Sequence, residues 1–233
     1  MTTKIHVYDE PIPGVLIRRY KRFLADVSVS GKTQTIFCPN SGSMLGCAVP
    51  GSDVMVSPAQ TPGGKTRYTL EMVKADGVWV GVNTLLTNRL ACSIIDASLI
   101  RDFPLRVIRK EVAFGESRLD ILLGDGEGLC YAEVKTVSLR DAGGIARFPD
   151  ARTERGRKHL GSLMEALEQG YRAAMIFVVQ RSDCRGFGPA DAIDPEYGRT
   201  LRTAIAGGVE VHALLCEVRP EGIWFLQKLQ VAF

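Results

Sequence analysis

The stretch that decides the fold spans residues 117–135 and reads SRLDILLGDGEGLCYAEVK. Two apolar runs flank its glycine-rich segment Gly124–Gly128, and this arrangement predicts two strands joined by a tight hairpin turn. Side chains alternate along a strand, so Glu133 and Lys135 share one face while Val134 points to the other. The second strand of the hairpin is therefore expected to carry an acid and a base on one face.

Asp120 is the only charged residue in the first apolar run. An ionised carboxylate in such surroundings needs a cation or several hydrogen bonds. If the two strands pair across the glycine turn, Asp120 approaches Glu133, and a divalent cation would relieve their repulsion. Mg²⁺ or Mn²⁺ could be held by Asp120 and Glu133, while Lys135 orients or deprotonates a water that attacks a phosphodiester. The structural alternative is an ordinary surface ion pair, for which an ExK pattern on a strand is common.

The segment after Asn83 predicts an α/β domain around this hairpin. Helical spacing of apolar residues runs from Leu85 to Leu99, and a second amphipathic helix is expected from about Thr153 to Gly170. Strands are expected at residues 106–114, 118–123, 129–139 and 171–180, followed by a helix after Pro195 and strands near 209–216 and 222–229. The strand at 171–180 is apolar on both faces, as in the centre of a covered sheet. The predicted order is αβββαβ with additions.

The first third of the chain predicts a small β-barrel. Residues 22–29 alternate between polar and apolar up to the turn at Ser30–Lys32. Further strands are expected at residues 33–38, 54–56, 67–74 and 78–82. Such short strands with regular turns favour a five-stranded OB-type barrel, a fold that often binds oligonucleotides, although a barrel without a ligand is the alternative. Gly64–Thr66 mimics the end of a phosphate-binding loop, but Ala59 stands where the first glycine is needed.

Two segments concentrate basic residues in a chain whose net charge is only +3. Residues 16–32 hold five basic residues against one acid, and residues 140–158 hold six against three. Such stripes suit a phosphate backbone, although a solvated face is the more common explanation. The expected DNA contacts are Arg18, Arg19, Lys21 and Arg22 from the first segment, Arg152, Arg155 and Lys158 from the second, and His159 directly after it. The second set surrounds the start of a helix, where exposed amide groups would also favour a phosphate.

Composition places the chain among globular proteins. Of its 233 residues 45% are hydrophobic, which is ordinary for a chain with a packed core. No stretch approaches the roughly 20 apolar residues that span a bilayer, and Met1–Pro13 lacks the plan of a signal peptide, so a cytoplasmic protein without membrane contact is expected. The six cysteines form no CxxC pair, which predicts buried thiols and not a zinc site or disulfides. Any metal would then be held by oxygen.

Short motifs are dispersed along the chain from about Leu16 to His212. They are Lys21–Val27, Asn40–Met44, Val80–Thr84, Ser117–Asp120, Glu133–Lys135, Phe148–Ala151, Arg155–Leu160 and Val179–Arg181. With these motifs the chain resembles the sugar fermentation stimulation protein A family. The resemblance implies an OB-like N-terminal domain, a C-terminal domain similar to PD-(D/E)xK nucleases, non-specific DNA binding, and a regulatory link to sugar metabolism, notably that of maltose.

The chain is expected to divide into an N-terminal arm at residues 1–13, an OB-like barrel at 14–85 and a PD-(D/E)xK nuclease-like αβββαβ domain at 86–233. Within the nuclease pattern, Asp120, Glu133 and Lys135 match the aspartate, the acid and the lysine, so the resemblance implies that they are the catalytic residues. Leu119 replaces the proline of the pattern. Asp96 would be the acid that the first helix sometimes supplies.

Two functions of different classes remain open at this point. One is a Mg²⁺- or Mn²⁺-dependent nuclease that acts on DNA, which the retained Asp120, Glu133 and Lys135 favour. The other is a non-catalytic DNA-binding regulator of sugar metabolism on a nuclease scaffold. An oligosaccharide-binding module is a third, weaker interpretation, because OB barrels also take sugars, but a chain with two tryptophans argues mildly against it. The oligomeric state is left open, with a homodimer as one option.

Overall fold

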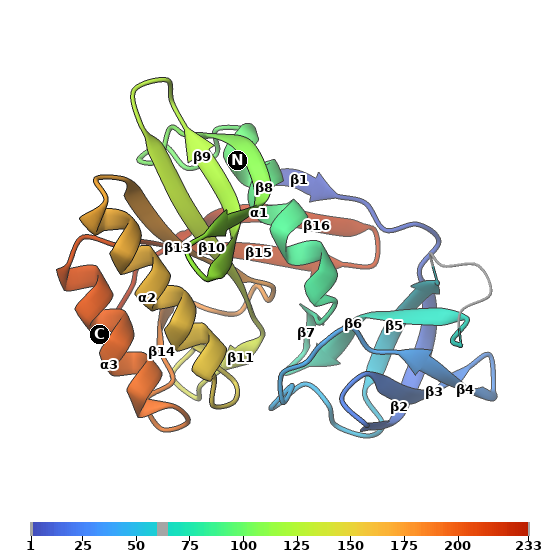
Figure 1. Ribbon diagram of the computed structural model, residues 1–233. Coiled ribbons are helices and arrows are strands. Elements are labelled where there is room, and N and C mark those ends of the chain that lie inside the picture. The colour runs from blue at the N-terminus through green and yellow to red at the C-terminus, as the bar shows by residue number, and fades with distance from the viewer. Residues whose placement is uncertain (1, 60–64, 233) are drawn as a thin grey trace.

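A five-stranded barrel and an α/β domain share one continuous sheet. In the computed structural model, which describes residues 2–59 and 65–232, thirteen strands form this sheet, eleven of them in one continuous order and two joined beside it (Figure 1). Gly64 of the Gly64–Thr66 segment lies outside the described residues. The fold class expected from the sequence, an OB-like barrel followed by an αβββαβ domain, is confirmed.

The barrel is closed by pairing between its first and last strands in the sheet order. Its strands are β2 (Ile12–Tyr20), β3 (Leu24–Val29), β4 (Lys32–Phe37), β5 (Asp53–Pro58) and β6 (Tyr68–Ala75). They pair in the order β4-β3-β2-β5-β6, and the pairing of Phe37 with Thr69 joins β4 to β6. Leu16, Ile36 and Val54 belong to the apolar core inside.

β2 is absent from the sequence prediction because its residues do not alternate. It begins with Ile12 and Pro13, and two adjacent arginines follow near its end. Gly14 lies so close to β3 that a Cβ atom there would be 2.6 Å from Val27 Cγ1. Close approach of the neighbouring strand, and not a local pattern, therefore fixes this part of the barrel.

The α/β domain has the predicted order of elements. They are η1 (Thr84–Leu86), α1 (Thr87–Asp96), β8 (Arg106–Phe114), β9 (Ser117–Gly124), β10 (Leu129–Val137), α2 (Glu154–Glu168), β13 (Arg172–Val179), α3 (Pro195–Ala206), β15 (Glu210–Arg219) and β16 (Gly222–Leu229). β7 (Val78–Gly81) connects the barrel to β15 through the pairing of Trp79 with Val218. The sheet then continues in the order β15-β13-β10-β9-β8.

Helices cover both faces of this sheet. α1 shares a core with Val134 on one face, whereas α2 and α3 lie side by side on the other (Figure 1). β13 is buried from Ala173 to Val179, as predicted for a central strand. Because Val134 faces α1, its neighbours Glu133 and Lys135 lie on the α2 face of β10.

The glycine-rich hairpin that the sequence predicts is confirmed. β9 and β10 are antiparallel, and Ala132 pairs with Ile121. The next residues along the two strands are Glu133 and Asp120, so this register brings them together.

Four short strands lie outside the sequence prediction. β1 (Thr3–His6) pairs with β16, so part of the expected N-terminal arm belongs to the α/β sheet. A second sheet contains β11 (Leu139–Arg140), β12 (Ile145–Phe148) and β14 (Gly186–Pro189), and the chain passes through its first two strands on the way from β10 to α2. None of the four exceeds four residues, which is too short for a periodic pattern to reveal.

The cysteines behave as the sequence predicts. All six are free and buried. Burial raises the pKa of Cys130 and of Cys216 to about 12, so both thiols stay protonated near neutral pH. A separate finding concerns the helices: across residues 2–59 and 65–232, none combines the length and the apolar character needed to cross a membrane.

Candidate metal and nucleic-acid site

A cleft of about 470 Å³ lies between the barrel and the α/β domain. The residues that line it are far apart in the sequence and come together in the folded chain. Among them are Arg22 and Asn40–Gly42 of the barrel, Thr84, Thr87 and Asn88 around the start of α1, Asp120 and Glu133–Thr136 of the hairpin, Arg147–Thr153 before α2, and Arg155, Gly156 and His159 on α2. The three residues predicted to be catalytic therefore share one cleft with four of the predicted DNA contacts.

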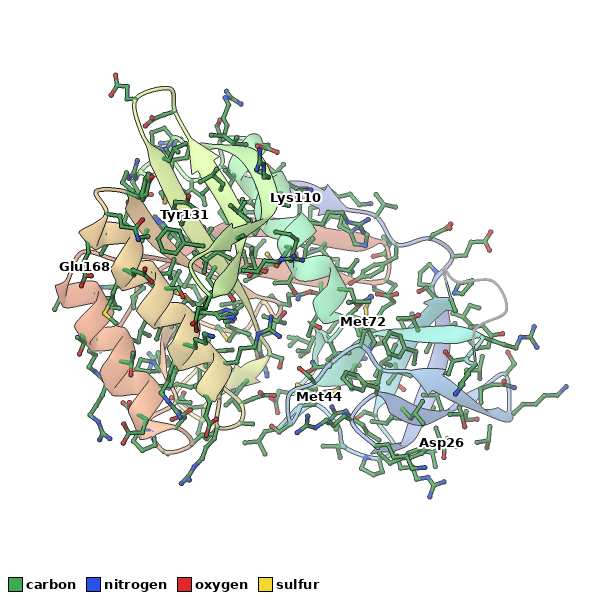
Figure 2. The ribbon with its side chains drawn as sticks, in the orientation of Figure 1. Asp26, Met44, Met72, Lys110, Tyr131 and Glu168 are labelled. Atoms are coloured by element: carbon green, nitrogen blue, oxygen red, sulfur yellow. The ribbon has the colours of Figure 1, made fainter. Side chains whose placement is uncertain are left out.

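β10 holds the site residues in a rigid frame. It is paired with β9 on one side and with β13 on the other. Tyr131 lies on the same face as Glu133, and its ring packs against Phe114 and Tyr171 at centroid distances of 4.7 and 5.3 Å (Figure 2). On the opposite face Val134 is buried in the core with α1. These contacts leave the backbone at Glu133 little freedom to move.

Asp120 is held by two hydrogen bonds from neighbouring elements. Its Oδ2 accepts from the Val134 backbone N–H at 2.8 Å, and its Oδ1 accepts from Asn88 Nδ2 at 2.9 Å. Burial raises the pKa of Asp120 above its usual range, and the nearby charge of Glu133 raises it further. A divalent cation at this carboxylate would offset both effects by favouring the ionised form.

Glu133 has one carboxylate oxygen that is fully engaged and one that is not. The side chain is buried, with only 1% of the residue exposed. Lys135 Nζ donates to Oε1, which also contacts His159 Nδ1, whereas Oε2 is buried with no hydrogen-bond partner among the described residues. Burial alone would raise the pKa of Glu133, but His159 and Lys135 outweigh it and hold that pKa below its usual range. Glu133 is therefore an ionised carboxylate with a free acceptor atom.

The donor set fits a divalent cation that prefers oxygen and retains water. Glu133 Oε2 is a buried acceptor without a donor, and Asp120 is a second carboxylate beside it. Within the part of the chain that the structure describes, no group of three His, Cys, Asp or Glu residues is placed to hold a metal. Mg²⁺ commonly uses one or two carboxylates and completes its shell with water and substrate phosphate, so two carboxylates suffice for it.

His159 links the acid-base pair to the helix on the same face of the sheet. Its Nδ1 lies 3.4 Å from Lys135 Nζ, and its Nε2 accepts from Arg155 Nε at 3.3 Å. α2 is fixed at its start by Thr153, whose side chain accepts from the Gly156 backbone N–H. The side-chain nitrogens of Lys135, His159 and Arg155 thus lie next to one another, from β10 to the first turns of α2.

The structure separates the eight predicted DNA contacts into two groups. Arg22, Arg152, Arg155 and His159 line the cleft. The remaining four, which are Arg18, Arg19, Lys21 and Lys158, do not. Arg18 Nε pairs with Asp26 Oδ2 at 2.7 Å, and Lys158 Nζ lies 3.7 Å from Glu116 Oε2. Arg19 donates to the backbone carbonyls of residues 40, 42 and 43, so its guanidinium supports a loop.

The expectation that Asp96 supplies an acid to the site is wrong. Asp96 lies at the C-terminal end of α1, where its Oδ1 accepts from the Val107 backbone N–H at 3.1 Å. The α1 residue that reaches the site is Asn88, near the other end of the helix. Thr87 also lines the cleft and hydrogen-bonds to Thr136 of β10. No pattern in the sequence marks Asn88, because its partner Asp120 comes from a separate strand.

The comparisons with known proteins bear out the resemblance. The family model described as "Sugar fermentation stimulation protein RE domain" matches residues 85–222, and the one described as "SfsA N-terminal OB domain" matches residues 17–82. Relatives named "Sugar fermentation stimulation protein homolog" include one from Geotalea daltonii, 53% identical over 94% of this chain and 96% of its own length. Another, from Geobacter sulfurreducens, is 51% identical over 94% of each chain.

A solved structure shares the whole architecture. The Pyrococcus furiosus SfsA structure in complex with Ca²⁺ matches with a TM-score of 0.92 and 28% sequence identity. The match covers 99% of this chain and 100% of that one. The relative position of the barrel and the α/β domain is therefore common to both proteins.

Proposed function

The chain belongs to the sugar fermentation stimulation protein family, and from this premise we propose that it is a DNA-binding protein that hydrolyses phosphodiesters at Asp120, Glu133 and Lys135 with a divalent cation. The observation that carries the proposal is the buried, unpartnered Oε2 of Glu133 beside the carboxylate of Asp120. An acceptor left without a donor costs free energy, and a bound cation would offset that cost.

The proposal that the chain binds a divalent cation has further support from a related structure. The Pyrococcus furiosus relative was solved in complex with Ca²⁺. Ca²⁺ and Mg²⁺ both prefer oxygen ligands, so Asp120 and Glu133 would hold Mg²⁺ or Mn²⁺ in this chain. When bound, the cation would stabilise negative charge on the scissile phosphate and make a nearby water more acidic.

The remaining side chains would position the water and the phosphate. Lys135 Nζ is held by Glu133 Oε1 next to the two carboxylates, where it can orient the attacking water by donating a hydrogen bond to it. Arg155 donates to His159 and lines the same cleft, so its guanidinium is placed to contact a phosphate oxygen. Arg22 lines the cleft from the barrel side.

The cleavage of DNA with and without metal tests the proposal. We expect the purified protein to nick plasmid or cut oligonucleotides in Mg²⁺ or Mn²⁺ and to stop when EDTA removes the cation. No cleavage of duplex, single-stranded or branched DNA in either metal, by protein shown to bind the DNA, would refute the hydrolytic part.

Non-catalytic DNA binding in the regulation of sugar metabolism is the second candidate. The observation that favours it is the contact of both Lys135 and His159 with Glu133 Oε1, which forms an ionic network without any metal. In that case DNA affinity would be independent of metal and no cleavage would accompany it.

Arg22 offers a specific test of the DNA contact. Replacing it with alanine should weaken binding to all DNA sequences alike and lower the slope of log affinity against log salt by about one, because one phosphate contact is lost. Arg18→Ala is the matched control from the same segment, since Arg18 lies outside the cleft and pairs with Asp26. Affinity is to be measured by fluorescence anisotropy at several salt concentrations. If the two variants behave alike, the cleft is not the DNA site.

A further inference from the structure

A short loop of the barrel forms part of the cleft wall and contacts the α/β domain. We name residues Asn40–Met44 the closing loop. At its start, Thr84 donates from its backbone N–H at 3.1 Å and from its Oγ1 at 2.6 Å to the carbonyl of Pro39. At its end, Ser43 Oγ donates to the Asp150 carbonyl at 2.6 Å. The barrel is thus joined to the α/β domain at both ends of the closing loop.

Asp150 and Arg19 contact the closing loop from its two sides. The backbone N–H of Met44 donates to Asp150 Oδ2 at 2.9 Å, and Met44 itself is buried in the barrel core (Figure 2). A Cβ atom at Gly42 would lie 2.6 Å from the Asp150 carboxylate oxygens, so a larger residue there would displace the Asp150 side chain. Arg19 supports the loop from the other side by donating to the carbonyls of Asn40 and Gly42 at 2.7 and 2.8 Å.

The size of the cleft limits what can reach the carboxylates. Its volume of about 470 Å³ is that of a pocket for one small molecule or nucleotide. Glu133 is only 1% exposed, so a scissile phosphate has to enter the cleft to meet it. A strand that remains base-paired and stacked would have to bring its complement along.

An aromatic pair, exposed Phe23 and half-buried Phe37, lies at the base of the closing loop. Phe23 directly follows the cleft residue Arg22 and is 45% exposed, which is high for so large an apolar side chain. Its ring centroid is 6.4 Å from that of Phe37. The Phe23 carbonyl accepts from the Cys38 backbone N–H at 2.9 Å, which fixes the pair two residues before Asn40. Unpaired bases stack on such aromatic side chains without regard to sequence.

From these observations we infer that the cleft takes a single DNA strand, with bases stacked at Phe23 and phosphates between Arg22 of the barrel and Arg152 and Arg155 of the α/β domain. The inference deepens the proposed function, on which it rests, by naming the substrate class. It combines a cleft of about 470 Å³, positive side chains on both of its walls, and a stacking surface beside its barrel wall.

The test compares one labelled oligonucleotide as a single strand and as a blunt duplex. Affinity is measured by fluorescence anisotropy in EDTA, where metal-dependent cleavage cannot occur. We expect the single strand to bind at least about tenfold more tightly. Phe23→Ala should reduce single-strand affinity by about 5- to 100-fold, the range for loss of one stacked base, and leave duplex affinity unchanged.

Two further variants keep this result interpretable. Phe23→Leu retains an apolar side chain without the aromatic ring and should weaken single-strand binding nearly as much as Phe23→Ala. Val49→Ala changes another exposed apolar residue of the barrel domain, one outside the cleft lining, and should bind as the native protein does. Circular dichroism and thermal melting confirm that each variant is folded.

Equal or tighter binding to the blunt duplex would overturn the inference, and so would native affinity in folded Phe23→Ala. Cleavage has no part in this readout. A protein that prefers single strands but never cuts DNA keeps the inference and refutes hydrolysis. A protein that cuts blunt duplex and shows no single-strand preference supports hydrolysis and refutes the inference.

Discussion

Glu133→Gln is expected to lower metal-dependent cleavage of DNA by about 100- to 1,000-fold, the size of effect seen when one electrostatic group of an active site is removed. The amide keeps the shape of the side chain but removes the charge that a cation and Lys135 both need. The fold should persist, because glutamine can still accept hydrogen bonds through its Oε1. Initial rates of oligonucleotide cleavage in Mn²⁺, with anisotropy of the same samples, measure the loss of activity and the retained DNA affinity.

Glu127→Gln is the matched control for this variant. Glu127 is on the same hairpin but exposed at the glycine turn, away from the cleft lining. It should cleave at the native rate. If Glu133→Gln also cleaves at the native rate, Glu133 takes no part in hydrolysis and the assignment of the site is wrong.

Arg181→Ala is expected to lower the free energy of unfolding by about 3–5 kcal/mol, because it breaks a buried ion pair and leaves its partners unsatisfied. Arg181 is 2% exposed. Its guanidinium donates to both Asp183 oxygens, at 2.7 and 2.8 Å, and to the Ser138 carbonyl at 2.9 Å. It also donates to Asp76 Oδ2 at 2.8 Å, and Asp76 lies in the turn between β6 and β7. This one side chain therefore ties the turn after β6 to the end of β13.

Urea denaturation measures the loss, and Arg219→Ala is its control. Arg219 pairs with Glu217 at 2.7 Å, but half of its side chain is exposed, so its removal should cost less than about 1 kcal/mol. Equal free energies of unfolding for the two variants would show that the hydrogen bonds of Arg181 do not stabilise the fold. DNA cleavage and binding by Arg181→Ala under conditions where it is folded should be close to native, because Arg181 does not line the cleft.

The hairpin could be predicted from the sequence because every signal for it is local. A glycine-rich turn, alternating side chains and a lone Asp120 all lie within residues 117–135, and the register follows from the length of the turn. β2 could not be predicted in the same way, since the need for Gly14 comes from the close approach of β3 and not from the residues around it. The sequence therefore predicted the elements whose residue pattern is visible within the element itself.

The sequence predicted the charged residues at the centre of the candidate site but not the residues around them. Asp120, Glu133 and Lys135 meet through a local register, whereas Asn88 and Asp150 reach the cleft from α1 and the loop before α2. Basic residues were the least predictable group. A sequence cannot distinguish an arginine that faces a phosphate from one that, like Arg19, binds backbone carbonyls within its own domain.

The central claim is that Asp120 and Glu133 together hold one divalent cation, and calorimetric titration of Mn²⁺ into native protein and Asp120→Asn tests it most directly. We expect one cation per chain in the native protein and loss of that binding in the folded variant. Native protein that binds no Mn²⁺, or an Asp120→Asn variant that binds it as tightly as native protein does, would contradict the account.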